Sequence, residues 1–191
     1  MKKVILLLTA IFAAAFAASA QVRITTPGTE LVLSAEVGED LKVLYFGNRL
    51  SDADFANLEF SGVSRHDAYP AYGFNCASEA ALAVTHADGN MSTVLKVESV
   101  TRSELIDNAI YTKVVMKDEV YPLYVTVCYK AYQDVDMIET WTEIANLEKK
   151  PVVLTRFDSG SIPVRFGDVW VSHLHGTWAN EGRLSQEPLD R

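Results

Sequence analysis

The stretch LYVTVCYKAYQDVDMIETWTEIAN, residues 123–146, decides the fold. Apolar or aromatic residues alternate with polar ones from Leu123 to Tyr132, and the same alternation returns from Met137 to Ala145. A period of two residues, with many β-branched and aromatic side chains, is typical of β-strands that have one buried face. The stretch therefore predicts two strands.

The same pattern extends outward in both directions along the chain. Turn residues separate the alternating segments, and we expect hairpin turns at Gly47-Asn48 and within residues 87–90. From Gln21 onward no segment shows a helical period over three turns. The pattern predicts an all-β fold of two packed antiparallel sheets, because a parallel sheet would need crossover helices. Further strands are expected at 31–35, 41–45, 82–84, 94–100, 109–116, 152–157 and 169–174.

The first twenty residues have the features of a secretory signal peptide. Lys2 and Lys3 precede an apolar run that ends in the small residues Ala18, Ser19 and Ala20. The run is shorter than the roughly 20 residues of a membrane span, and the small residues place cleavage before Gln21. We therefore predict an exported protein, periplasmic or extracellular, with no membrane span after cleavage.

Composition excludes several other classes of protein. Without Lys2 and Lys3 the chain keeps 15 basic against 25 acidic residues, a balance that repels nucleic-acid backbones. No phosphate-binding glycine loop, nucleophile elbow or Cys/His ligand cluster is present, and we expect no cofactor and no metal. Cys76 and Cys128 could pair in an oxidising compartment or remain separate buried thiols.

Four segments, in the same order along the chain, resemble the N-terminal domain of family 36 glycoside hydrolases, the bacterial α-galactosidases. LKVLYFGNRL resembles the family's first hairpin, and AYPAYGFNCASEAAL resembles its Tyr-Pro-x-Tyr-Gly loop. DVDMIETWTEIAN resembles a strand that ends in Asn. HLHGTWANE resembles the segment before the linker to a TIM barrel. These segments occupy residues 41–50, 68–82, 134–146 and 173–181.

The resemblance implies a β-supersandwich, the galactose-mutarotase-like fold. It also implies hydrolysis of terminal α-galactosides by two aspartates, which lie in the family's catalytic barrel. Retaining hydrolysis needs two carboxyl groups about 5–5.5 Å apart. We expect residues 1–20 to be the signal peptide, 21–177 the supersandwich, and 178–191 a truncated linker toward a missing barrel. No catalytic residue is therefore assigned to this chain.

By the family's example, a loop of this domain can border the sugar pocket, including that of a neighbouring subunit. Aromatic faces stack on sugar rings, and carboxylates accept hydrogen bonds from sugar hydroxyls. Loop positions favour such a role for Tyr69, Tyr72 and Asp54, with Trp178 as a fourth candidate. Asp52 and Phe55 lie beside Asp54.

Other pairs of residues have simpler interpretations. His173 and His175 share one face of an expected strand and could bind a metal, but no third ligand has a selective spacing. A mutarotase-like site would pair one of them with Glu139, Glu143 or Glu181. Asp134 and Asp136 fit a solvated pair at the end of a strand. We expect Trp141 to pack in the core or between the sheets.

We therefore expect a non-catalytic N-terminal domain of an exported α-galactosidase-like enzyme. Such a domain would support the barrel, shape its substrate entrance and help to form a homo-oligomer. The alternative is a free-standing periplasmic module that binds carbohydrate or interconverts sugar anomers.

Overall fold

The computed structural model of this chain describes residues 21–56, 66–73, 79–162 and 169–188. Strands dominate these residues, and the helix among them is the five-residue α1 (Asp52–Ala56). The expected signal peptide, residues 1–20, lies outside the described residues, as does Cys76. The structure confirms the predicted all-β fold of packed antiparallel sheets.

The first sheet has four antiparallel strands, and its order follows the chain. Leu31 of the second strand lies opposite Ile24 on one side and Phe46 on the other. Its strands are β1 (Gln21–Thr25), β2 (Thr29–Ser34), β3 (Lys42–Asn48) and β4 (His66–Asp67).

The second sheet contains the stretch from residue 123 to 146 that decided the fold. The third strand of this sheet pairs with a neighbour on each side along most of its length. Its Cys128 lies opposite Lys113 on one side and opposite Trp141 on the other. The turn before β7 (Ala109–Asp118) places Asp107 and Asn108 at φ of 48° and 58°, the left-handed region that a tight hairpin turn requires. Its strands are β6 (Leu95–Arg102), β7 (Ala109–Asp118), β8 (Leu123–Tyr132) and β9 (Ile138–Asn146).

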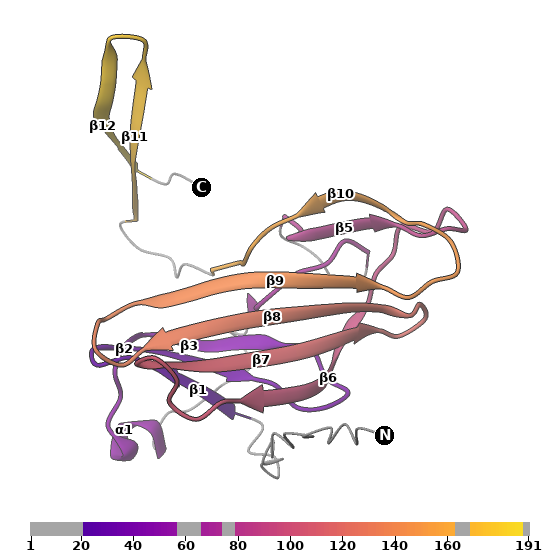
Figure 1. The fold of residues 1–191 in the computed structure, drawn as a ribbon, viewed down its shortest axis with the longest axis horizontal. Helices are drawn as coiled ribbons and strands as arrows, with labels where there is room; N and C mark the ends of the chain where they lie inside the picture. The colour runs from indigo at the N-terminus through magenta and orange to yellow at the C-terminus, as the bar shows by residue number, and fades with distance from the viewer. Residues whose placement is uncertain (1–20, 57–65, 74–78, 163–168, 189–191) are drawn as a thin grey trace, which may run out of the picture.

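The core forms where the two four-stranded sheets face each other (Figure 1). Along β8 the inward residues Leu123, Val125 and Val127 are almost completely buried. They pack in one cluster with Ile24 and Leu33 of the first sheet. The alternation seen in the sequence is thus the division between the core side and the outer side of each strand.

Two smaller strand pairs complete the fold. β5 (Leu82–Thr85) pairs with β10 (Val153–Phe157), and β11 (Trp170–Thr177) pairs with β12 (Asn180–Pro188). Figure 1 shows the β11–β12 hairpin standing away from the packed sheets. All residues of β11 are exposed, so this hairpin adds no side chain to the core.

Several local predictions were wrong. Gly47 and Asn48 lie inside β3 and pair with Glu30 and Thr29, so they form no hairpin turn. Residues 87–90 do form a turn, in which the His86 N–H donates to the Asn90 carbonyl at 2.8 Å. However, the flanking strands β5 and β6 belong to different sheets.

The C-terminal segment also differs from its expected local structure. Much of residues 178–191, which we expected to be linker, forms β12 and pairs with β11. The hairpin turn is made by Trp178 and Ala179, with Ala179 at a φ of 63°. Because β12 is exposed nearly throughout, it carries no pattern of buried residues that would have predicted a strand.

Candidate functional site

Asp54 lies in α1, which follows the first sheet's third strand. The Ser51 hydroxyl lies 2.7 Å from the Asp54 carboxylate and also accepts the Asp54 N–H at 3.1 Å. Both side chains are exposed, so the Asp54 carboxylate can still meet a ligand. Arg23 and Glu30, which sequence reasoning did not select, hold the chain just before this helix.

The two candidate tyrosines have opposite environments. Tyr69 is 4 % exposed and its hydroxyl donates to the Asp158 carbonyl at 2.8 Å, so it is a packing residue rather than a sugar contact. Burial raises the pKa of this hydroxyl. Tyr72 is 51 % exposed, while its backbone bonds to Leu82 and Thr93. Its ring is therefore available on a fixed piece of backbone.

Gly73 explains why the Tyr72 loop can approach the neighbouring chain so closely. Its φ is 132°, and a Cβ at this position would lie 2.6 Å from Ser92 Cα. A residue with a side chain would force the loop away from the Ser92 backbone. In the Tyr-Gly pair of the sequence motif, Gly73 thus packs closely against the Ser92 backbone, and the exposed Tyr72 ring lies directly before it.

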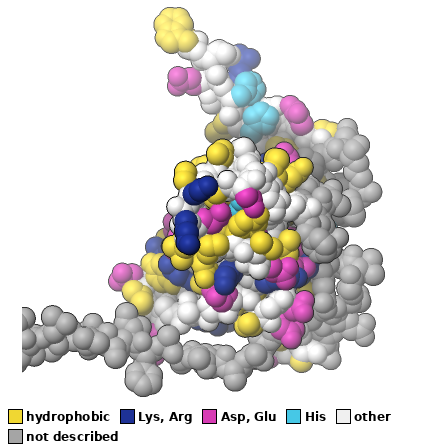
Figure 2. All heavy atoms as spheres, turned by 90° about the vertical axis from the view of Figure 1, so that its right-hand side faces the viewer, with side chains coloured by type: hydrophobic (Ala, Val, Ile, Leu, Met, Phe, Trp, Pro, Cys, Tyr) yellow, Lys and Arg dark blue, Asp and Glu magenta, His cyan; other side chains and the backbone are white. Residues whose placement is uncertain are grey.

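Trp178 lies at the tip of the β11–β12 hairpin and is 95 % exposed. An open hollow beside it is lined by residues of the same hairpin, including His175, Thr177 and Glu181. Figure 2 shows hydrophobic and histidine side chains on the projecting part of the molecule. The tip offers an aromatic face and polar groups, but it does not enclose a ligand.

The structure does not bring the four candidates together. The cavity beside Tyr69 has a volume of about 40 Å³ and includes none of the other three in its lining. This is far below the roughly 300 Å³ at which ligand pockets begin. The hollow at Trp178 belongs to the hairpin alone. Asp54, Tyr72 and Trp178 are therefore separate exposed contacts that would need a partner surface to form a sugar pocket.

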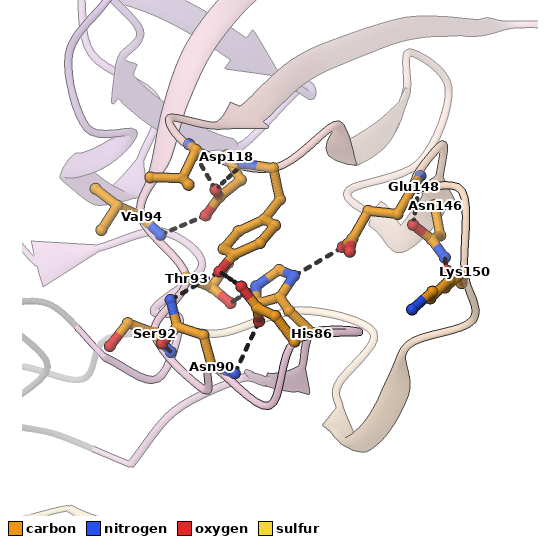
Figure 3. A network of polar contacts seen from close by, with 12 residues as sticks. His86, Asn90, Ser92, Thr93, Val94, Asp118, Asn146, Glu148 and Lys150 are labelled. Atoms are coloured by element: carbon orange, nitrogen blue, oxygen red, sulfur yellow. Dashed lines mark hydrogen bonds and ion pairs between the residues drawn. The ribbon is translucent and has the colours of Figure 1, made fainter.

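His86, rather than a hairpin histidine, is the one that contacts a glutamate within the described residues. Its side chain is fully buried, and Nδ1 lies 2.8 Å from Glu148 Oε1 (Figure 3). Nε2 lies 3.3 Å from the Thr93 hydroxyl, and the ring stacks on Tyr121 at 3.7 Å. Because the two groups contact each other directly, this pair has no room for a sugar between them.

The Tyr121 side of this network is anchored to the loop before the second sheet. The Tyr121 hydroxyl donates to Asp88 at 2.8 Å and accepts from Asn90 at 3.0 Å. The Asp118 carboxylate accepts the N–H groups of Val94 and Tyr121 (Figure 3). The network joins the turn after β5, the β7–β8 connection and the turn after β9, and this role is structural.

The hairpin histidines stand side by side on the polar face of β11. The ring centroids of His173 and His175 are 5.9 Å apart, and Arg183 lies opposite His175. Within the described residues no group of three His, Cys, Asp or Glu side chains could hold a metal ion. A cation beside His175 also opposes the binding of a metal ion.

Asp134 and Asp136 are an exposed pair at the end of a strand, as predicted, whereas Trp141 lies elsewhere than expected. Asp134 and Asp136 belong to the turn between β8 and β9, where Asp136 accepts a hydrogen bond from Thr26 and Asp134 one from Asn108. Trp141 lies opposite Cys128 and donates to Glu143 at 3.2 Å. Its side chain is thus on the outer face of the second sheet, and the prediction of core packing was wrong.

Cys128 is a buried free thiol on that same outer face. Cys76, the other cysteine of the possible pair, lies outside the described residues. The Cys128 thiol lies 3.5 Å from the Glu143 carboxylate. Burial, followed by the Glu143 charge, raises its pKa to about 11.

Together these features define a β-sandwich domain with exposed polar and aromatic contacts, in which neither the small cavity beside Tyr69 nor the open hollow at Trp178 encloses a ligand. The sequence matches the Glycosyl hydrolase family 36 N-terminal domain over residues 39–191, well over half of the chain, and the protein belongs to this family. This confirms the resemblance found in the four sequence segments. No curated protein sequence matches the chain.

Solved structures show the same fold. The α-galactosidase AgaB of Geobacillus stearothermophilus is 22 % identical with a TM-score of 0.75, and the match covers 90 % of this chain and 27 % of that enzyme. The α-galactosidase of Lactobacillus brevis is 18 % identical with a TM-score of 0.69, covering 89 % and 27 %. A variant of AgaA from Geobacillus stearothermophilus, solved with raffinose, is 22 % identical with a TM-score of 0.76, covering 89 % and 28 %. This chain thus spans little more than a quarter of these enzymes.

Proposed function

We propose that this chain is a non-catalytic supporting domain of an exported α-galactosidase-like glycoside hydrolase. The observation that carries the proposal is the match to the family's N-terminal domain, in a chain that spans little more than a quarter of the α-galactosidases it resembles. In this role the domain packs against a catalytic domain of the same family and shapes the entrance of its sugar pocket. Asp54, Tyr72 and Trp178 are the contacts that it offers there.

The shape of the β11–β12 hairpin supports a role in binding another protein surface. One face carries Trp170, Leu174 and Leu184, which are 60 %, 70 % and 62 % exposed. An isolated two-stranded hairpin is at best marginally stable in water, so an uncovered apolar face favours contact with a partner. We propose the catalytic domain, or a second subunit of the assembled enzyme, as that partner.

Export is part of the proposal and rests on the N-terminal sequence. No helix in the part of the chain that the structure describes is long and apolar enough to cross a membrane. A signal peptide predicts that the mature protein begins at Gln21. Intact-mass measurement of protein recovered outside the cytoplasm tests this, and a mature chain that still begins at Met1 would contradict it.

A second candidate function is sugar binding by the chain alone, which the exposed rings of Tyr72 and Trp178 favour. Titration of the purified chain with galactose and with raffinose, followed by NMR, separates the two functions. A supporting domain should show no saturable binding, because its sugar contacts are dispersed. Saturable binding that is lost in Tyr72→Ala but kept in Phe46→Ala, a control at another exposed aromatic residue, would instead establish a binding module.

A further inference from the structure

Glu30 is a charged residue in an unusual place. Its side chain is 0 % exposed, although it does not belong to the core between the sheets. Leu31 and Leu33 of β2 point into that core, so the alternation of the strand directs Glu30 to the outer side of the first sheet. A buried carboxylate is costly unless it is paired and hydrogen-bonded.

Arg23, on the neighbouring strand β1, is the partner of this carboxylate. Its guanidinium forms a two-point contact with Glu30, with Nε on one carboxylate oxygen and Nη2 on the other. A second edge of the guanidinium reaches Asp52 at 2.9 Å, and its Cζ lies over the Phe55 ring, 4.3 Å from the ring centre. Arg23 thus joins the buried carboxylate to both ends of the α1 segment.

The same two residues also hold the peptide groups of Leu50, just before the helix. Glu30 accepts the Leu50 N–H at 3.0 Å, and Arg23 donates to the Leu50 carbonyl at 3.3 Å. Both backbone polar groups of Leu50 are therefore fixed by one ion pair. Arg49 adds an ordinary backbone bond from its N–H to the Gly28 carbonyl at 2.8 Å.

Helix α1 cannot hold this position by itself. It has five residues, none of which is buried, whereas isolated helices shorter than about 12 residues are marginal in water. The direction of α1, and of the Asp54 carboxylate within it, therefore depends on contacts outside the helix, among them those of Arg23 with Asp52 and Phe55.

We propose that Arg23 and Glu30 are positioning residues, which hold residues 50–56 so that Asp54 is preset as a sugar contact at the entrance. The inference rests on the proposed function for the use of Asp54. If the segment is already held in place before a sugar binds, less conformational entropy is lost on binding.

The test is hydrogen–deuterium exchange of the full chain carrying Arg23→Lys. Lysine keeps a positive charge beside Glu30 but loses the planar fork that reaches Glu30, Leu50 and Asp52 together. We expect exchange of the Leu50, Asp54 and Phe55 amides to become about tenfold faster, as for the loss of a charged hydrogen bond, with β6–β9 unchanged. Arg156→Lys, which changes another ion-paired arginine, should leave residues 50–56 as in the wild type.

Unchanged exchange of residues 50–56 in Arg23→Lys would overturn the proposal. An equal acceleration across both sheets would also overturn it, because Arg23 would then be a general stability residue. Neither result depends on sugar binding, so both are distinguishable from a failure of the proposed function.

A second arm examines the sugar contact in the enzyme assembled with its catalytic domain. Arg23→Lys and Asp54→Ala should both raise KM for raffinose at unchanged kcat, while Arg156→Lys changes neither. If Asp54→Ala has no effect but exchange in Arg23→Lys still accelerates, the entrance role fails and the positioning of the segment stands.

Discussion

The surroundings of Cys128 lower the reactivity of its thiol. The thiol is fully buried and lies beside the Glu143 carboxylate, and burial is the main reason that its pKa rises to about 11. Since the thiolate is the reactive form, only a small fraction of the Cys128 thiol is ready to react near neutral pH. In this environment the thiol reacts slowly with electrophiles.

We therefore predict slow alkylation of Cys128 in the native chain. In a Cys76→Ser background, the rate with iodoacetamide should keep rising with pH up to about 11, the value to which burial and Glu143 raise the thiol's pKa. Urea-unfolded protein provides the control, with a rate that levels off near the ordinary cysteine value of about 8.5. A native rate that levels off at the same pH as the unfolded chain would contradict this environment.

The buried His86–Glu148 contact provides a second test at the scale of residues. Glu148→Ala leaves an imidazole without its acceptor where the His86 side chain is 0 % exposed. We expect a loss of about 1–3 kcal/mol in the free energy of unfolding, measured in urea. Glu79→Ala, which removes the 79 % exposed partner of Arg156, should cost less than about 1 kcal/mol. Equal losses in the two variants would show that burial of the contact adds nothing.

At the scale of elements, Asp136 joins two turns that belong to different sheets. It accepts a hydrogen bond from Thr26 in the β1–β2 turn, while Gln133 donates to the Thr25 carbonyl at 2.7 Å. The hydrogen bond from Thr26 is the main cause of a lowered pKa for the Asp136 carboxyl. The ends of the two sheets are thus tied together by a charged group that is absent from the core.

This tie predicts a pH dependence with a definite sign. Because the folded-state pKa of Asp136 is lowered, its stabilising effect is present above the ordinary aspartate pKa of about 4 and is lost as pH falls below it. Urea unfolding at a series of pH values should show a shallower acid limb in Asp136→Asn than in the wild type. Asp134→Asn is the control in the same turn, and an identical acid limb in all three proteins would contradict the tie.

Burial explains which elements could be predicted from the sequence. β8 and β9 were predicted because one side of each strand faces the core and the other does not. β12 was missed because nearly all its residues are exposed, and hydrophobic alternation cannot mark a strand without a buried face. The false hairpin at Gly47-Asn48 has a different cause, since a turn-forming pair can also continue a strand when a neighbour supplies the pairing.

The candidate site was predicted less completely than the fold. Asp54, Tyr72 and Trp178 are exposed, so their role as sugar contacts stays a prediction, whereas Tyr69 packs in the core. Arg23 and Glu30 could not be found from sequence, because their contact depends on the register between two strands and on the path of the chain after β3. The expectation that a loop of this domain borders a sugar pocket came from the family resemblance and not from the spacing of residues.

For the whole molecule, the exposed apolar face of the β11–β12 hairpin can be changed with little effect on the stability of the chain, so its role in binding a partner can be tested separately. Leu174→Ser together with Leu184→Ser should change the unfolding free energy of the chain by less than about 0.5 kcal/mol each, because both side chains are exposed. Leu123→Ala, at a residue with 0 % exposure, should cost about 2–5 kcal/mol in the same urea experiment. A large loss from the hairpin changes would mean that the face is already covered within the chain.

The central claim is that this domain supports a glycoside hydrolase without performing the hydrolysis. The most direct measurement is release of p-nitrophenol from p-nitrophenyl α-galactoside by the purified chain. No release above the buffer rate is expected, because the chain matches the family's N-terminal domain and spans little more than a quarter of the α-galactosidases it resembles. Release that increases in proportion to the concentration of the chain, and that persists after a further purification step, would contradict the claim.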